Sequence, residues 1–184
     1  GGDGTHSGDT LAAAAAAAAA LRTLRLGSVI LLHPEADLDR FVRSDFAALR
    51  RVCSTISLYC DLRDPALFLA EGLVFRSTTL QWLMGSGNRC AAPNQYKGFR
   101  SLGLHPQCLV HPETSASLDM DVIDISWMEH NVADRHNFFT KNFWMVSDIR
   151  EIIVSGRRAR LRVQRLVARG GNMFSFIAAP PQVS

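Results

Sequence analysis

The sequence predicts an α/β fold in which a parallel sheet is flanked by helices. Three short apolar runs bounded by turn residues support this prediction: residues 28–33 (SVILLH), 54–60 (STISLYC) and 122–127 (VIDISW). Continuous apolar runs of this length are typical of strands buried on both faces, as in parallel sheets. Helical patterns alternate with the runs, which also favours parallel pairing. We therefore expect the three strands to be adjacent, in chain order, with right-handed crossovers.

The predicted helices lie before, between and after these runs. They are residues 11–26, 38–53 and 66–75, and a stretch in which Phe143, Val146, Ile149 and Ile153 recur at helical spacing. The first contains nine consecutive alanines, the residue with the highest intrinsic helix propensity. The second is amphipathic, and the third is an apolar helix that begins beside Pro65.

The alternation is interrupted at residues 76–121, which are rich in glycine, proline and serine. So long a stretch without a regular pattern is unusual inside a compact domain, and we interpret it as an irregular insertion over the carboxyl edge of the sheet. With 184 residues, 47% of them hydrophobic, the chain can bury one core. The predicted organisation is a domain over residues 1–156, which includes the insertion, and a C-terminal extension over residues 157–184.

The C-terminal extension is rich in arginine, with six of these residues within positions 157–169. Arg158, Arg162, Arg165 and Arg169 could share one helical face, which we interpret as solvated. Contact with phosphate or with an anionic membrane is the alternative. Residues 173–177 could add a short strand. The formal net charge of the whole chain is only +3, so no nucleic-acid partner is expected.

The chain has four cysteines: Cys53, Cys60, Cys90 and Cys108. They form no C-x-x-C pair, which suggests reduced thiols and an intracellular, cytoplasmic protein. No apolar run reaches the ~18–20 residues of a membrane-spanning helix, and no basic region precedes the first apolar stretch as in a secretory signal. His105, Cys108 and His111, with Cys90 upstream, could ligate zinc, but their spacing is not that of a standard finger. Neither a metal nor a cofactor is predicted.

Polar residues follow the predicted strands where a parallel sheet places its ligands, outside the carboxyl edge. Asp61 and Asp64 follow the second strand, and His130 and His136 follow the third. Ser7 precedes the first helix, so the chain order is serine, aspartate, histidine. In such a triad the histidine is the general base that activates the serine, and a buried carboxylate holds the imidazole tautomer.

Three stretches of the sequence resemble a known family: HPEADLDRF, ISLYCDLRDPALFLAEG and RHNFFTKNFWMVSDIREII. They are similar to the C-terminal half of an α/β-hydrolase family, the esterase-like proteins long known as a domain of unknown function. The matching residues are Pro34, Asp37, Asp39, Phe41, Tyr59, Asp64, Ala66, Leu67, His136, Phe139, Asp148, Ile149, Arg150 and Glu151. The resemblance covers residues 28–75 and 122–156, and it depends on the order and spacing of the motifs together.

This resemblance implies a serine hydrolase of small-molecule esters or lipids, with Ser7 as nucleophile, Asp64 as triad acid and His136 as triad base. Asp61 and His130 are the competing choices. Asp9 stands where the family has the glycine of its strained nucleophile turn. The strands that precede the serine in the family have no counterpart. The resemblance therefore implies a partial α/β-hydrolase fold with its N-terminal strands missing.

Such a chain is expected to be a fragment, since it also lacks an initiator methionine. It is expected to be weakly active, because the missing part supplies half of the oxyanion hole. The open edge of the sheet would favour self-association. The alternative is a non-catalytic hydrolase-like remnant, or an interaction module that uses the arginine-rich extension.

Overall fold

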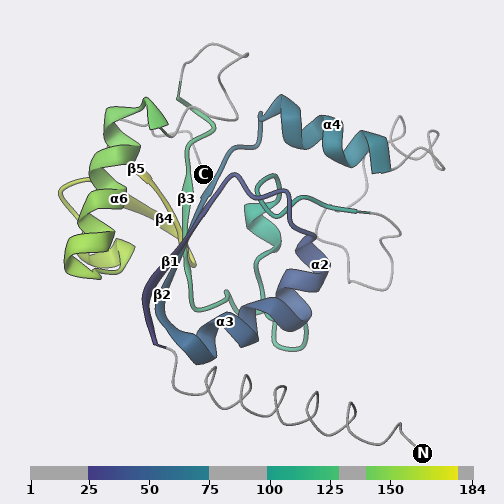
Figure 1. Ribbon diagram of the computed structural model, residues 1–184, viewed down its shortest axis with the longest axis horizontal. Coiled ribbons are helices and arrows are strands. Elements are labelled where there is room, and N and C mark those ends of the chain that lie inside the picture. The colour runs from purple at the N-terminus through teal and green to yellow at the C-terminus, as the bar shows by residue number, and fades with distance from the viewer. Residues whose placement is uncertain (1–24, 75–98, 129–139, 178–184) are drawn as a thin grey trace, which may run out of the picture.

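The computed structural model describes residues 25–74, 99–128 and 140–177, and the structural statements below concern these residues. They form a five-stranded sheet in the order β1-β2-β3-β5-β4, with helices packed against it (Figure 1). The strands are β1 (Leu26–Leu32), β2 (Cys53–Cys60), β3 (Asp121–Asp124), β4 (Leu166–Gly170) and β5 (Met173–Phe176). All neighbours pair in parallel except β4 and β5, which are antiparallel. The protein has an α/β arrangement with a mostly parallel sheet.

The predicted adjacency of the first three strands is confirmed. β1 pairs in parallel with β2, and β2 with β3, so Leu32 lies opposite Tyr59 and Cys60 lies opposite Asp124. The strand boundaries differ by at most three residues from those predicted. β3 ends at Asp124 because the side chain of this residue accepts a hydrogen bond from the backbone N–H of Ser126, which turns the chain away.

The amphipathic segment after β1 forms one helical layer in three parts. These are α2 (Leu38–Arg40), a π-helical turn η1 (Phe41–Asp45) and α3 (Phe46–Val52). The side chain of Asp37 caps the start of the layer by accepting from Arg40 N at 2.9 Å. Phe41 is buried, and its ring lies 6.1 Å from that of Phe46. The predicted helix is thus present, and its apolar side faces the sheet.

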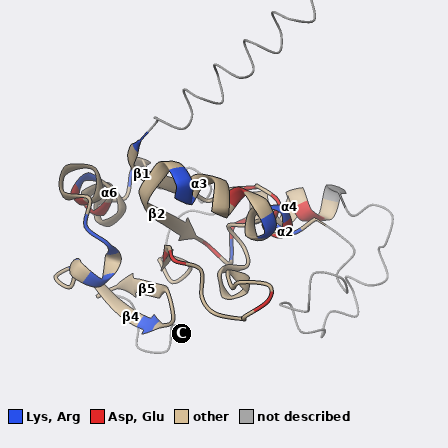
Figure 2. Ribbon diagram, turned by 90° about the horizontal axis from the view of Figure 1, so that it is seen from below, with Lys and Arg blue, Asp and Glu red and all other residues tan. Residues whose placement is uncertain are grey.

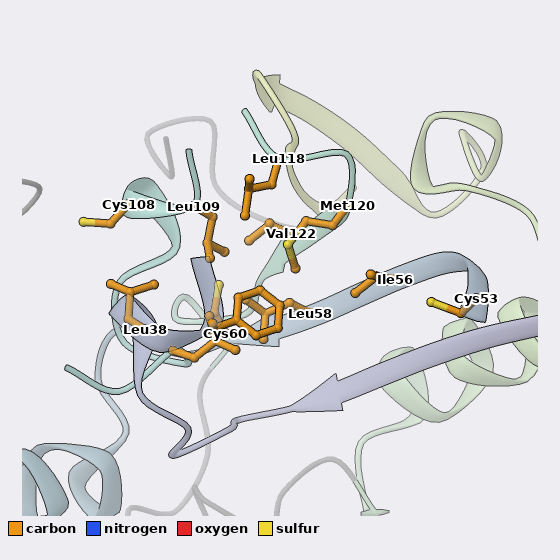
Figure 3. Close-up of a cluster of buried hydrophobic side chains, with 12 residues drawn as sticks. Leu38, Cys53, Ile56, Leu58, Cys60, Cys108, Leu109, Leu118, Met120 and Val122 are labelled. Atoms are coloured by element: carbon orange, nitrogen blue, oxygen red, sulfur yellow. The ribbon is translucent and has the colours of Figure 1, made fainter. Parts of the chain in front are cut away.

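β2 lies between β1 and β3 and supplies side chains to an apolar cluster on each face. On one face, Ile56, Leu58 and Cys60 pack against the helical layer and the segment before β3 (Figure 3). On the other face, Tyr59 packs with side chains of α6 (Phe143–Ser155). Alternation along one strand therefore joins the two clusters into a three-layered core.

The described part of the segment predicted as irregular, residues 99–120, belongs to the core. It contains a 3₁₀ turn, η2 (Pro106–Cys108), and an isolated bridge between Val110 and Ser117. Its buried apolar side chains are Leu102, Leu104, Cys108, Leu109, Leu118 and Met120. The local sequence shows no regular period because the segment is held by scattered turn bonds and by burial against β2, not by a helical ladder.

The last helix, α6, is confirmed, but its buried side differs from the spacing that predicted it. Asn142 caps it by accepting from Met145 N at 3.1 Å, and Gly156 ends it in the left-handed conformation. The buried residues are Met145, Asp148 and Ile152. Three of the four residues that predicted the helix, Phe143, Val146 and Ile153, are exposed. Periodicity could not assign the inner side because the helix is apolar on both sides.

The predicted helical face of arginines is wrong. Residues 157–177 form a 3₁₀ turn, η4 (Ala159–Leu161), and then the β4–β5 hairpin, which joins the same sheet as β1–β3. Arg158 binds Asp119 at 2.8 Å and Asp121 at 2.9 Å, and Arg165 binds Glu151 at 2.7 Å. The acidic partners lie 14 to 39 residues earlier in the chain, so a local pattern could not reveal them.

The most buried of these arginines is Arg162, whose side chain is fully enclosed and paired with the equally enclosed Asp148. The hydroxyl of Tyr59 donates to the same carboxylate oxygen, Oδ2 of Asp148, at 2.6 Å. Burial and the nearby Asp148 raise the pKa of Tyr59 well above its usual value, so its hydroxyl stays protonated as a donor. This buried polar cluster ties β2, α6 and the segment before β4 together. Among the described helices, none is long and apolar enough to cross a membrane.

Candidate functional site

The carboxyl ends of β1, β2 and β3 meet at one edge of the sheet, and several polar side chains are buried there. Because the strands are parallel and in register, the residues that follow them are brought together although they are distant in sequence. His33 follows β1, Asp61 and Asp64 follow β2, and Asp124 ends β3. All four are buried. This edge is the position where the sequence predicted a site.

Asp64, the predicted triad acid, is held by hydrogen bonds to one carboxylate oxygen and lies beside a histidine through the other. Oδ1 accepts from Ala66 N at 2.9 Å and from Leu67 N at 3.4 Å, which caps α4 (Pro65–Val74). Oδ2 lies 3.5 Å from Nδ1 of His33, and neither side chain is exposed. Proline at the first helical position fixes the approach of the chain to this cap. The carboxylate is therefore buried, oriented and adjacent to an imidazole.

His33 was not among the residues predicted for the site. Its backbone N–H continues the ladder by donating to Tyr59 O at 3.1 Å, and its φ of 42° is in the left-handed region. Such a conformation is uncommon for a residue with a side chain, although histidine adopts it more readily than most. The available signal was a histidine at the end of an otherwise apolar strand, directly before Pro34.

Asp61, the competing acid, has a different environment. Its Oδ1 accepts from Arg63 N at 2.9 Å, and its own N–H donates to Gly103 O at 3.1 Å. These bonds stabilise the turn between β2 and α4, and the Asp61 side chain is engaged within that turn. The nearby thiol of Cys60 is fully buried, and burial raises its pKa well above the usual value, with Asp124 and Asp61 adding to the effect.

Ser126 connects the turns after β2 and β3. Its hydroxyl donates to Asp124 Oδ1 at 2.5 Å and accepts from Leu62 N at 2.8 Å. The carboxylate of Asp124 is thus directed into its own turn, and the two loops that follow β2 and β3 are held side by side. Neither residue was singled out from the sequence, since an Asp-x-Ser turn has no distinctive pattern.

A strap formed by residues 100–104 crosses the carboxyl ends of β1 and β2. Its backbone pairs with the loop after β1 through Leu38 N to Arg100 O at 2.8 Å and Leu102 N to Ala36 O at 2.8 Å. Gly103 donates to Pro34 O at 2.9 Å. A Cβ at Gly103 would lie 3.2 Å from the carbonyl carbon of His33, so only glycine lets the strap approach this closely. The strap therefore lies against the backbone at the end of β1 and against Leu67 of α4.

A second, partly buried acid–imidazole pair anchors the strap to α4. Glu71 Oε1 lies 2.9 Å from His105 Nε2 and accepts from Ser101 N at 2.5 Å. His105 was considered as a zinc ligand, but this ring nitrogen faces a carboxylate. Cys108 is disulfide-bonded, which corrects the expectation of reduced thiols and removes it as a thiolate ligand. The described residues contain no group of three or more metal-binding side chains.

Of the three predicted triad residues, Asp64 alone lies within the described part of the chain. Ser7 and His136, together with the competing His130, lie outside it. The structure therefore places Asp64 at the carboxyl edge, buried and oriented, and its association with Ser7 and His136 stays a prediction.

Comparison with known proteins adds no family assignment. No protein-family model matches the chain, and no curated protein or solved structure gives a significant match. The resemblance to esterase-like α/β-hydrolases, carried by the motifs around Pro34, Asp64 and His136, accordingly stays a prediction.

Proposed function

We propose that this chain carries the acid and base of an α/β-hydrolase-type serine hydrolase that acts on small acyl esters or lipids. The observation that supports the proposal best is the environment of Asp64. A triad acid must be buried, held by hydrogen bonds and located after a strand at the carboxyl edge. Asp64 meets these three requirements: its side chain is enclosed, its Oδ1 caps α4, and it follows β2.

In the proposed reaction, His136 takes the proton of the Ser7 hydroxyl as the oxygen attacks the ester carbonyl. Asp64 holds the imidazole in the tautomer that accepts this proton and stabilises the imidazolium that forms. His136 then returns the proton to the alcohol that leaves. Water hydrolyses the acyl-enzyme by the same sequence of proton transfers. We propose slow turnover for this chain, because Asp9 occupies a position where the nucleophile turn requires a small residue.

The experiment measures covalent capture by a fluorophosphonate probe alongside hydrolysis of p-nitrophenyl butyrate. Capture is a single event per molecule, so it detects a functional nucleophile even when turnover is slow. The variants are Ser7→Ala, His136→Ala and Asp64→Asn, with Asp61→Asn as the matched control. In Asp64→Asn the asparagine Oδ1 can still cap α4. A loss of activity in this variant can therefore be distinguished from a loss of folding.

We expect capture in the wild-type chain, none in Ser7→Ala, and a rate in Asp64→Asn reduced by as much as ~10⁴, as for wrong-tautomer variants of known triads. Asp61→Asn should react within about threefold of wild type, a loss small beside that of a triad member. Capture that persists in Ser7→Ala, or an Asp61→Asn defect larger than that of Asp64→Asn, would contradict the assignment.

The second candidate is a non-catalytic hydrolase-like protein, and one observation favours it. Oδ1 of Asp64 caps a helix and Oδ2 lies against the buried His33. These are contacts of a carboxylate that has a structural role. The same experiment separates the two candidates, since absence of probe capture in the folded wild-type chain would favour the non-catalytic one.

A further inference from the structure

The outward side of α6 is apolar in a way that exposed helices rarely are. Phe143, Ile153 and Val154 are 76%, 70% and 78% exposed, and Val146 lies on the same side. At 100° per residue these four side chains fall within one sector of about 100°, and Arg150 lies inside it. The opposite side of the helix, with Met145 and Ile152, is buried against the sheet. A helix that is apolar on both sides is normally covered on both sides.

The exposed charged side chains of α6 and of the residues that flank it in sequence have one sign. Within the described residues 140–161, every exposed charged side chain is basic: Lys141, Arg150, Arg157 and Arg160. The two acidic residues of the stretch are withdrawn from the surface, since Asp148 is enclosed with Arg162 and Glu151 is half-buried and paired with Arg165. Figure 2 shows the resulting blue segments in the connection that follows α6. The exposed apolar surface is therefore bordered by positive charge.

This charge distribution decides between the possible occupants. A second copy of the chain, related by a twofold axis, would bring a second set of the same basic side chains to this surface, which is unfavourable. An acidic lipid surface offers both complements at once, acyl chains for the apolar side chains and phosphate or carboxylate groups for the arginines. We propose that the outward side of α6 (Phe143, Val146, Arg150, Ile153 and Val154) binds the interface of anionic phospholipid membranes. This surface is independent of the proposed triad.

The aromatic residues at the start of α6 fit the same role. The ring of Trp144 lies 6.4 Å from that of Phe143 and 6.2 Å from that of Phe176, so it is held by packing at the border of the exposed surface. Trp144 is 42% exposed. Tryptophan is enriched at membrane interfaces because its ring is apolar while its N–H can bind water or headgroups.

Co-sedimentation with vesicles tests the proposal. The full chain is mixed with phosphatidylcholine vesicles, with or without about 30% phosphatidylserine, the lipid that gives membranes their negative surface. We expect binding to the anionic vesicles and at least about fivefold less to the neutral ones. The double variant Ile153→Ser/Val154→Ser should lose at least about tenfold in binding because it removes two apolar contacts. Arg150→Glu should lose at least about fivefold without changing any packed side chain.

The matched control is Leu69→Ser in α4, an apolar residue that is 62% exposed and away from α6 (Figure 1). It should bind as wild type does. Thermal melts establish that each variant is folded. Equal binding of the wild type to neutral and anionic vesicles, or an equal loss in Leu69→Ser, would overturn the proposal. So would a dimer in solution that Ile153→Ser/Val154→Ser abolishes while no vesicle binding is seen, since the surface would then bind a second copy.

Discussion

Nδ1 of His33 lies 3.5 Å from Oδ2 of Asp64, and both side chains are fully enclosed. His33 at the end of β1 and Asp64 at the start of α4 thus form a buried polar pair that joins these two elements. Burying a carboxylate is unfavourable unless its oxygens are satisfied, so the pair should matter to folding whether or not Asp64 takes part in catalysis.

Replacing His33 should test this pair directly. We expect His33→Ala to lower the free energy of unfolding by about 2–4 kcal/mol, since it leaves a cavity and takes a polar neighbour from a buried carboxylate. His33→Asn should cost less, because asparagine tolerates positive φ and retains a hydrogen-bond donor. Urea unfolding measures both. Equal losses for the two variants would mean that the imidazole only fills space.

The cap made by Asp64 predicts a second contrast. Asp64→Ala should destabilise the protein by about 0.5–2 kcal/mol through loss of the cap, while Asp64→Asn should be close to neutral in this respect. Glu35→Ala, at an exposed position in the loop after β1, serves as the control and should lie within about 0.5 kcal/mol of wild type. If Asp64→Asn were as damaging as Asp64→Ala, the charge and not the cap would be the important property.

Two glycines should respond to alanine in opposite directions. At Gly103 the new Cβ would lie 2.8 Å from Leu67 Cδ1 and 3.2 Å from backbone atoms of His33 and Pro34. We expect Gly103→Ala to cost about 1–3 kcal/mol, because the backbone of the strap cannot retreat freely. At Gly72 in α4 a Cβ meets nothing within 4 Å, so Gly72→Ala should stabilise the helix by up to ~1 kcal/mol. Calorimetric melting of the two variants should show shifts of opposite sign.

The Arg162–Asp148 pair should make the protein sensitive to loss of one partner. Arg162→Leu leaves a carboxylate enclosed with only the Tyr59 hydroxyl, and we expect a loss of about 3–5 kcal/mol near pH 7. Adding Asp148→Asn to this variant should recover a large part of the loss, because no unpaired charge is then buried. A double variant no more stable than Arg162→Leu would contradict this explanation.

The pH dependence of the same variant has a definite sign. Burial raises the pKa of Asp148, while Arg162 and the Tyr59 hydrogen bond oppose the rise. A raised folded pKa favours the protonated acid in the folded state, so the contribution is present below the unfolded pKa of about 3.9 and is lost as pH rises through the folded pKa. In Arg162→Leu the folded pKa of Asp148 should rise further, so the stability lost with increasing pH should be larger. The stability gap between wild type and Arg162→Leu should therefore narrow as pH falls from 7 towards about 4.5.

The cysteines give a prediction about covalent structure. Cys53 and Cys60 are buried free thiols, whereas Cys108 is disulfide-bonded. The unfolded but unreduced chain should therefore show two reactive thiols, and all four cysteines of the sequence should react after reduction. A count of four before reduction would show that the bond does not form under the conditions of purification. Ellman's reagent in denaturant provides the measurement.

The parallel arrangement of β1, β2 and β3 could be predicted because it depends on local information. Each strand is a short apolar run, and turn residues such as Pro34 mark the ends. The observed strand end differs from the predicted one where a side chain binds the backbone in place of the neighbouring strand, as Asp124 does at the end of β3. Of the β4–β5 hairpin, only the second strand was predicted. Arg162 and Arg165 give the segment before β4 a helical period, but their ion pairs hold this segment in another conformation.

The candidate site was predictable in position but not in composition. Asp64 could be located because it follows a buried strand and precedes Pro65. The role of His33 could not be predicted, since it depends on Asp64. This residue follows the neighbouring strand β2 and lies about 30 residues later in the chain. Glu71 and His105 were equally hidden, because the strap that joins them has no periodic pattern.

The position of β4 at one border of the described sheet has a consequence for how the molecule opens. β4 is bonded to β5 alone, whereas β2 is bonded to a strand on each side. Arg162 and Arg165, which lead into β4, are paired with residues of α6, so β4 and that helix should open together, with loss of the Tyr59–Asp148 hydrogen bond to β2. Amide protons of β4 and α6 would then exchange with solvent at a common, faster rate, and those of β2 would exchange only when the whole protein unfolds.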